Sequence, residues 1–74
     1  MVSIIILIHA SVGTIWEACK AIEKIDGIQK AHAVTGPYDI IAYAELPSTE
    51  DLRRMTKSIH EVTGVNRTES CIAI

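Results

Sequence analysis

The sequence predicts an α+β fold in which two helices cover one face of a four-stranded antiparallel sheet, in the order βαββαβ. Two segments carry apolar residues at helical spacing, and each lies between two segments with the composition of strands. A Gly-Pro turn, typical of a hairpin, joins the two halves. "KIDGIQK" and "EVTGVNR" place Gly27 and Gly64 at equivalent points, half the chain length apart. A strand-helix-strand unit used twice is the ferredoxin-like arrangement.

The first half begins with residues 2–9, which are apolar at nearly every position and predict a strand buried on both faces. A helix follows, capped by Ser11 or by Thr14, the latter with Glu17 as a capping box. Asp26-Gly27 ends this helix, and residues 28–35 predict the second strand. The apolar stripe of the helix consists of Val12, Ile15, Cys19, Ile22 and Ile25.

The second half repeats this pattern after the Gly36-Pro37 turn. Residues 39–46 predict a strand, which Pro47 ends, and Ser48 with Asp51 three residues later predicts the start of a helix. Gly64 closes that helix, and residues 67–74 form the last strand. The stripe of the second helix consists of Leu52, Met55, Ile59 and Val62. The fold uses the whole chain, so we expect one domain over residues 1–74.

Charge and cysteine content narrow the class of protein. A net charge of −2 and a pI near 5.8 give no electrostatic footprint for nucleic acid, so we expect no direct DNA binding. The opening "MVSIIILIHASVG" lacks the basic start of a signal peptide, and no 18-residue apolar span follows. Cys19 and Cys71 each lie in an apolar pattern and predict buried free thiols. These features predict a soluble, cytoplasmic protein without a membrane partner.

The apolar content exceeds what one small core can bury. Hydrophobic residues make up 49% of the chain, and the mean hydropathy is +0.28. Two helices cover only one face of the sheet, so the other face is left with Ile5, Leu7, Ile41 and Tyr43. A second copy, packed sheet against sheet with two-fold symmetry, is the simplest cover. We therefore expect a homodimer, and Trp16, near the start of the first helix, in the core or at an interface.

Signatures of catalysis are absent. His9, His32 and His60 fall on different elements without metal-ligand spacing, and Cys19 lies on a buried helix stripe. No glycine-rich phosphate loop is present. We expect no enzyme activity, no cofactor and no metal. A small dimeric α+β enzyme of the monooxygenase or isomerase kind, and an oligomerisation unit without a ligand, remain the alternatives.

The stretch "VTGPYDII" and the last strand carry the candidate site. Asp39 starts a strand, where aspartate is disfavoured unless its carboxylate has a task. That task is either an Asx-type hydrogen bond that tightens the hairpin or contact with a ligand or partner. In the last strand, Thr68 and Ser70 point to one face, and their hydroxyls are neutral donors suited to a small zwitterion.

Taken together, the sequence resembles the ligand-binding (RAM) domain of the Lrp/AsnC transcriptional regulators. "VTGPYDII" matches the V-T-G-x-Y-D hairpin of that family, "VTGV" follows the second helix, and "RTESCIAI" matches its final T-x-T/S-x-I strand. The resemblance implies an amino-acid effector bound in a cleft between dimers. The implied ligand-binding residues are Gly36, Tyr38, Asp39, Thr68 and Ser70.

The resemblance also implies partners. Homodimers would assemble into higher oligomers, such as an octamer or decamer ring, and binding would be coupled to assembly. The helix-turn-helix domain that usually precedes this fold is absent from the sequence, so we expect a stand-alone form that associates with full-length Lrp/AsnC regulators. Pro37 departs from the family pattern and removes a backbone N–H that could bind a carboxylate. We expect that the hairpin tip does not reach the last strand of its own subunit, so the site forms where two dimers meet.

Overall fold

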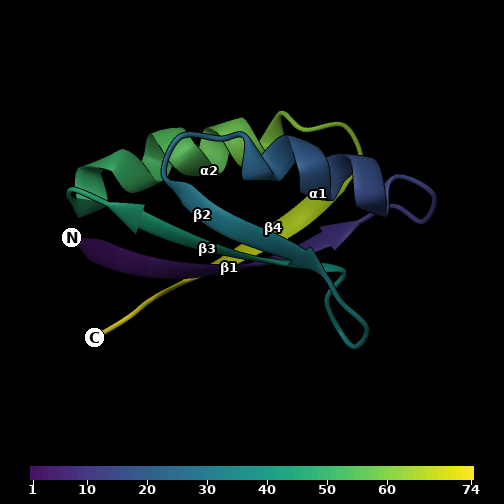
Figure 1. The fold of residues 1–74 in the computed structure, drawn as a ribbon, viewed down its shortest axis with the longest axis horizontal. Helices are drawn as coiled ribbons and strands as arrows, with labels where there is room; N and C mark the ends of the chain where they lie inside the picture. Colours follow the sequence, from purple (N-terminus) through teal and green to yellow (C-terminus); the bar gives the residue numbers. More distant parts are fainter.

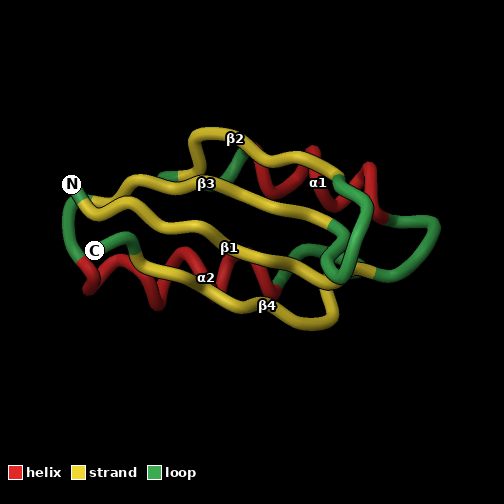
Figure 2. Tube along the Cα trace, turned by 90° about the horizontal axis from the view of Figure 1, so that it is seen from below, coloured by secondary structure: helices red, strands yellow, loops and turns green.

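The computed structural model describes all 74 residues, which form one sheet with two helices on one of its faces (Figure 1). The sheet has the strand order β2-β3-β1-β4 (Figure 2). Every neighbouring pair of strands is antiparallel. The predicted βαββαβ fold is therefore confirmed. The elements are β1 (Val2–Ala10), α1 (Ile15–Glu23), β2 (Ile28–Ala33), β3 (Ile40–Leu46), the 3₁₀ turn η1 (Thr49–Asp51), α2 (Leu52–His60) and β4 (Val65–Ile72).

The core lies between the sheet and the helices. Side chains alternate along each strand, so Ile4, Ile6 and Ile8 of β1 point toward the helices and are buried. Ala18, Cys19, Ile22, Ile40, Ala42, Ala44, Leu46, Met55 and Ile59 are among the residues that complete this single cluster. The other face of β1 is not covered within the subunit, because both helices lie on the same side. The prediction that β1 is buried on both faces is wrong for the single subunit.

Helix α1 begins later than its apolar spacing suggested. The Thr14 hydroxyl donates to the Ser11 carbonyl at 2.8 Å and makes no capping bond with the helix, so the predicted capping box is wrong. Val12 lies before the helix and is exposed, so it does not belong to the buried stripe. Cys19 is buried as predicted, and burial, with Glu23 nearby, raises the pKa of its thiol.

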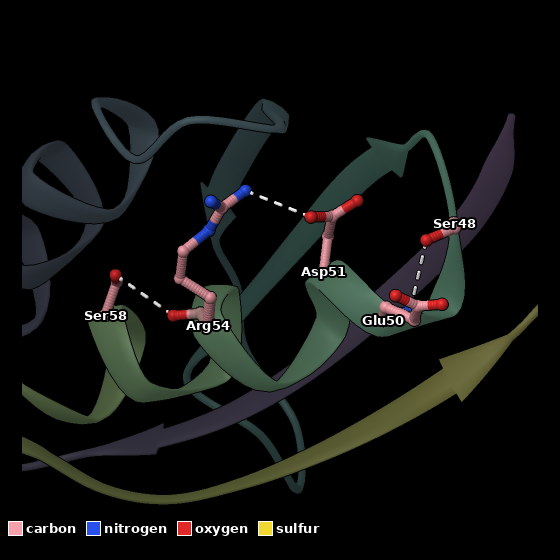
Figure 3. Close-up of polar contacts among 5 residues, drawn as sticks. All are labelled: Ser48, Glu50, Asp51, Arg54 and Ser58. Carbon is pink, nitrogen blue, oxygen red and sulfur yellow. Dashed lines mark hydrogen bonds and ion pairs between the residues drawn. The ribbon is translucent and has the colours of Figure 1, made fainter.

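The entry into α2 follows the sequence signal closely (Figure 3). The Ser48 hydroxyl accepts a hydrogen bond from the Glu50 N–H at 3.3 Å, which caps the 3₁₀ turn before the helix. Asp51 pairs with Arg54 at 3.1 Å, and the Ser58 hydroxyl donates to the Arg54 carbonyl at 3.2 Å. Met55, on the buried face, packs into the core.

The two similar sequence segments around Gly27 and Gly64 form the same type of turn. Gly27 and Gly64 have φ angles of +97° and +96°, and each is followed by the first residue of a strand. The N–H of Ile28 donates to the Ile25 carbonyl at 3.1 Å, and the N–H of Val65 donates to the Val62 carbonyl at 3.2 Å. Each helix therefore returns to the sheet through the same left-handed glycine turn.

Replacing Gly64 with alanine is expected to destabilise the fold by about 1–3 kcal/mol more than replacing Gly13 with alanine. Both glycines have a φ of +96°, so both variants carry the same backbone strain. A Cβ at residue 64 would overlap the Thr14 hydroxyl, whereas a Cβ at residue 13 meets nothing. Urea unfolding at one protein concentration measures the difference, and equal midpoints would contradict it.

The bounds of β2 and β4, and the exposure of Cys71, differ from the predictions. Strand β2 ends at Ala33, two residues early, and β4 runs from Val65 to Ile72. Cys71 pairs with Ile5 on the open face of the sheet and is exposed, so the prediction of a buried thiol is wrong here. An edge strand without a helix above that face leaves the thiol uncovered in the subunit. Neither helix is long and apolar enough to cross a membrane.

Candidate functional site

The candidate site starts at the β2–β3 hairpin, residues 34–39. In Figure 1 this loop drops below the sheet, away from the helices. Gly36 allows the sharp turn, since its φ of +121° lies in a region that favours glycine, and nothing crowds its Cα. The hairpin therefore projects on the open side of the sheet, next to the end of β1.

Asp39 makes three hydrogen bonds, two of which join the hairpin to β1. Its carboxylate Oδ2 accepts from the Ala10 N–H at 2.8 Å, and its own N–H donates to the Ile8 carbonyl at 2.9 Å. Its carbonyl accepts from the Val34 N–H at 2.9 Å. The predicted Asx-type bond within the hairpin is not the one that forms, because the carboxylate reaches across to a different strand. The other carboxylate oxygen, Oδ1, makes no hydrogen bond in the subunit.

Tyr38 crosses the end of β1 and reaches β4. Its ring lies 4.9 Å from the His9 ring, and its hydroxyl donates to the Glu69 carboxylate at 3.4 Å. Desolvation, reinforced by Glu69, raises the pKa of the Tyr38 hydroxyl, so it remains a donor at neutral pH. Arg67 lies 3.7 Å from the same carboxylate. The expectation that the hairpin does not reach its own last strand is therefore wrong.

Thr68 and Ser70 lie on the opposite face of the sheet from the hairpin. They pair with Ile8 and Ile6, whose side chains point to the helices, and directly paired residues share a face. The Thr68 hydroxyl lies 3.0 Å from His60 Nε2 at the end of α2, which confirms this orientation. Ser70 is exposed, since β4 is an edge strand, and its hydroxyl makes no hydrogen bond in the subunit.

The five predicted site residues thus form two groups in one subunit. The hairpin group, Gly36, Tyr38 and Asp39, lies on the open side, and the β4 pair, Thr68 and Ser70, lies on the helix side. The sheet separates the two groups, so a ligand that contacts both would need residues from two subunits.

The open face of the sheet is apolar at its centre and polar at its margins. Ile5 and Tyr43 are paired across β1 and β3, and each is 38% exposed. Leu7 and Ile41 form the neighbouring pair and are half-buried. At the margins, the Lys30 ammonium lies 4.9 Å from the Tyr43 ring, and Ser3 donates to Glu45 at 3.2 Å. An apolar centre with a polar rim is the pattern of a protein interface.

A hollow that the sequence did not indicate lies beside the hairpin. Its volume is about 590 Å³, and its walls come from the β1–α1 loop, the start of α1 and the end of β2 with the hairpin stem. Trp16 and Val12 are 73% and 93% exposed, although both are large and apolar. The helical spacing had assigned Val12 to the core. The hollow is lined by Val12, Gly13, Ile15, Trp16, Ala33, Val34 and Thr35.

The remaining titratable side chains do not gather into a metal centre. No three His, Cys, Asp or Glu side chains lie close enough together to hold a metal ion. His9 stacks near Tyr38, His60 contacts Thr68, and His32 pairs with Ile41 on the open face. The histidines are therefore distributed over three places.

Comparisons with known proteins agree with this architecture. A family model described as the Lrp/AsnC ligand binding domain matches residues 3–74. An uncharacterised HTH-type transcriptional regulator of Pyrococcus furiosus is 37% identical over 70 residues, which are 95% of this chain and 47% of that protein. The chain thus spans about half the length of this curated relative.

Two solved structures illustrate the likeness of fold. A protein from Thermus thermophilus is 31% identical, with a TM-score of 0.95 over 100% of this chain and 94% of that chain. The feast or famine regulatory protein of M. tuberculosis, solved with L-methionine, is 19% identical, with a TM-score of 0.82 over 100% of this chain and 50% of that chain. Because the family model matches nearly the whole length of this chain, the chain belongs to the Lrp/AsnC ligand-binding domain family.

Proposed function

We propose that this domain binds an α-amino acid effector at the β2–β3 hairpin and couples that binding to the assembly of its subunits. The observation that carries the proposal is the arrangement of unused hydrogen-bonding groups on the hairpin. The backbone N–H groups of Gly36 and Tyr38 and the Asp39 Oδ1 all lack partners in the subunit. Donors and an acceptor on one short loop match the two charges of an amino acid.

The chemistry of each group fits one end of the ligand. Asp39 Oδ1 accepts from the α-ammonium, a charge-assisted bond worth about 1.5–3 kcal/mol. The N–H groups of Gly36 and Tyr38 donate to the α-carboxylate, while Pro37 between them has no N–H to offer. The M. tuberculosis regulator solved with L-methionine has the same fold, which supports an amino acid as the class of ligand.

A second subunit supplies Thr68 and Ser70. These hydroxyls lie across the sheet from their own hairpin, so the complete site combines the hairpin of one subunit with β4 of another. A ligand that bridges two subunits stabilises the assembly by mass action. Dimers formed through the open sheet face then join into a larger ring, an octamer or a decamer, through these sites.

The regulatory output is association with full-length Lrp/AsnC regulators. Their ligand-binding domains share this fold, so the domain of a regulator would take the place of a second copy of this chain. Direct DNA contact by this domain is not part of the proposal, because its net charge is −2. The amino acid would thus act through mixed assemblies.

The family assignment bears on the two alternatives. The family consists of transcriptional regulators and not enzymes, which removes the support for a monooxygenase or isomerase. A ligand-free oligomerisation unit would use the same sheet face, but it assigns no role to the hairpin N–H groups that have no partner in the subunit.

A thermal-shift screen against the twenty amino acids, run beside light scattering, tests the proposal. At least one amino acid is expected to raise the melting temperature and the assembled mass together. The Ser70→Ala variant should lose most of this response and keep the parent's stability, because the Ser70 hydroxyl has no partner in the subunit. If no amino acid shifts the melting temperature, effector binding is contradicted and the ligand-free alternative stands.

A further inference from the structure

We infer that Glu69 is a positioning residue of the hairpin: its carboxylate holds the Tyr38 hydroxyl and thereby fixes the direction of the free N–H groups at the hairpin tip. This inference rests on the proposed function and adds a residue that acts on the site through Tyr38. Glu69 lies on β4 between Thr68 and Ser70, but it pairs with Leu7 and therefore faces the open side of the sheet.

The tip of the hairpin has few other attachments. Residues 35–37 make no hydrogen bond in the subunit, and the bond from the Val34 N–H to the Asp39 carbonyl closes only the stem. Pro37 fixes its own φ, but the residue before it is a glycine, whose backbone is the least restricted and which nothing crowds. The Tyr38 side chain is therefore what ties the tip to the sheet.

The Tyr38 side chain reaches β4 across the end of β1. Its ring lies 4.9 Å from the His9 ring, and its hydroxyl donates to Glu69 Oε1 at 3.4 Å in a partly buried position. Desolvation and the Glu69 carboxylate raise the pKa of the Tyr38 phenol, which therefore keeps the proton that it donates. The contact from the hairpin thus ends on a carboxylate of the same subunit.

Arg67 is the second partner of this carboxylate. Its Nη2 lies 3.7 Å from Glu69 Oε2, so the two oxygens of one carboxylate have different partners. The Arg67 side chain is 71% exposed, and surface ion pairs of this kind contribute little to stability. We therefore expect the main effect of Glu69 at the hairpin, through the oxygen that Tyr38 contacts.

Calorimetric titrations with the twenty amino acids measure this effect. The amino acid that binds the parent most tightly should bind Glu69→Ala and Tyr38→Phe at least about fivefold more weakly, since each variant loses the same hydrogen bond. The double variant should bind no more weakly than either single variant. Glu69→Gln keeps a hydrogen-bond partner for the Tyr38 hydroxyl, so its affinity should stay within about twofold of the parent's.

Glu45→Ala is the matched control, and it should bind as the parent does. It removes the same charge from the same face, at the end of β3 away from the hairpin. The Gly36 amide resonance of the ligand-free protein gives a readout that needs no ligand. Glu69→Ala and Tyr38→Phe should shift this resonance alike, whereas Glu69→Gln should leave it near its position in the parent.

The outcomes separate this inference from the function on which it rests. If Glu69→Ala binds as tightly as the parent, or if the two losses add in the double variant, Glu69 does not position the hairpin, while effector binding stands. If no amino acid binds the parent, both fail. If Glu69→Ala lowers the assembled mass without ligand and Tyr38→Phe does not, Glu69 is a contact between copies, and the inference is overturned.

Discussion

Replacing Ile5 with lysine should raise the dissociation constant of the proposed sheet-to-sheet dimer at least about 100-fold, which is about 2.8 kcal/mol at 1.4 kcal/mol per tenfold. Ile5 lies on the central strand, between Tyr43 of β3 and Cys71 of β4, at the middle of the open face. A second copy packed on that face would bury the lysine ammonium without a partner, and an unpaired buried charge is strongly unfavourable.

Light scattering over a series of protein concentrations measures this effect. The parent is expected to show at least twice the 8.1 kDa subunit mass at micromolar concentration. Ser3→Lys is the matched control, since it adds the same charge two residues away on the same face, at the exposed end beside Glu45. The Cys71 thiol gives an independent readout, because it should react with a thiol reagent faster in Ile5→Lys than in the parent. A parent mass of 8.1 kDa would refute the sheet-to-sheet dimer.

The order of elements was predictable because the periodicities of this sequence are strong. β1 alternates between side chains that face the helices and side chains that face the open side, and α2 has a clear stripe ending at Ile59. The two glycine turns repeated the same local chemistry, so one half of the chain supported the assignment of the other.

The start of α1 was less predictable, because local spacing does not reveal tertiary contacts. Val12 continues the helical stripe in sequence, but the chain first forms a turn in which Thr14 bonds to Ser11. Ser11 in turn donates its N–H to the Gly64 carbonyl at 2.8 Å. A contact between residues so far apart in sequence sets where the helix begins.

The candidate site was only partly predictable for the same reason. The sequence singled out Asp39 as a carboxylate with a task, but its partner, the Ala10 N–H, lies on another strand. The strand order places β1 between β3 and β4, which puts Tyr38 within reach of Glu69 and leaves Thr68 on the far side of the sheet. The hollow combines three separate segments, so no single motif could indicate it.

Asp39 has two roles that two substitutions should separate. Asp39→Asn keeps an oxygen that can accept from the Ala10 N–H, so the free energy of unfolding should change by less than about 1 kcal/mol. It removes the negative charge, so binding of an amino acid should weaken at least tenfold. Asp39→Ala also removes the acceptor and leaves the Ala10 N–H unpaired, which should lower the free energy of unfolding by about 1–3 kcal/mol.

Urea unfolding at a fixed protein concentration and calorimetric titration measure these two effects separately. In Asp39→Ala the end of β1, at Ala10, loses its bond to the hairpin just before the β1–α1 loop begins, so the Trp16 emission of the ligand-free protein should change as well. In Asp39→Asn that emission should match the parent's, because the end of β1 remains bonded to the hairpin. If Asp39→Asn binds an amino acid as tightly as the parent, the carboxylate serves only to join the hairpin to β1, and the ammonium group must be bound elsewhere.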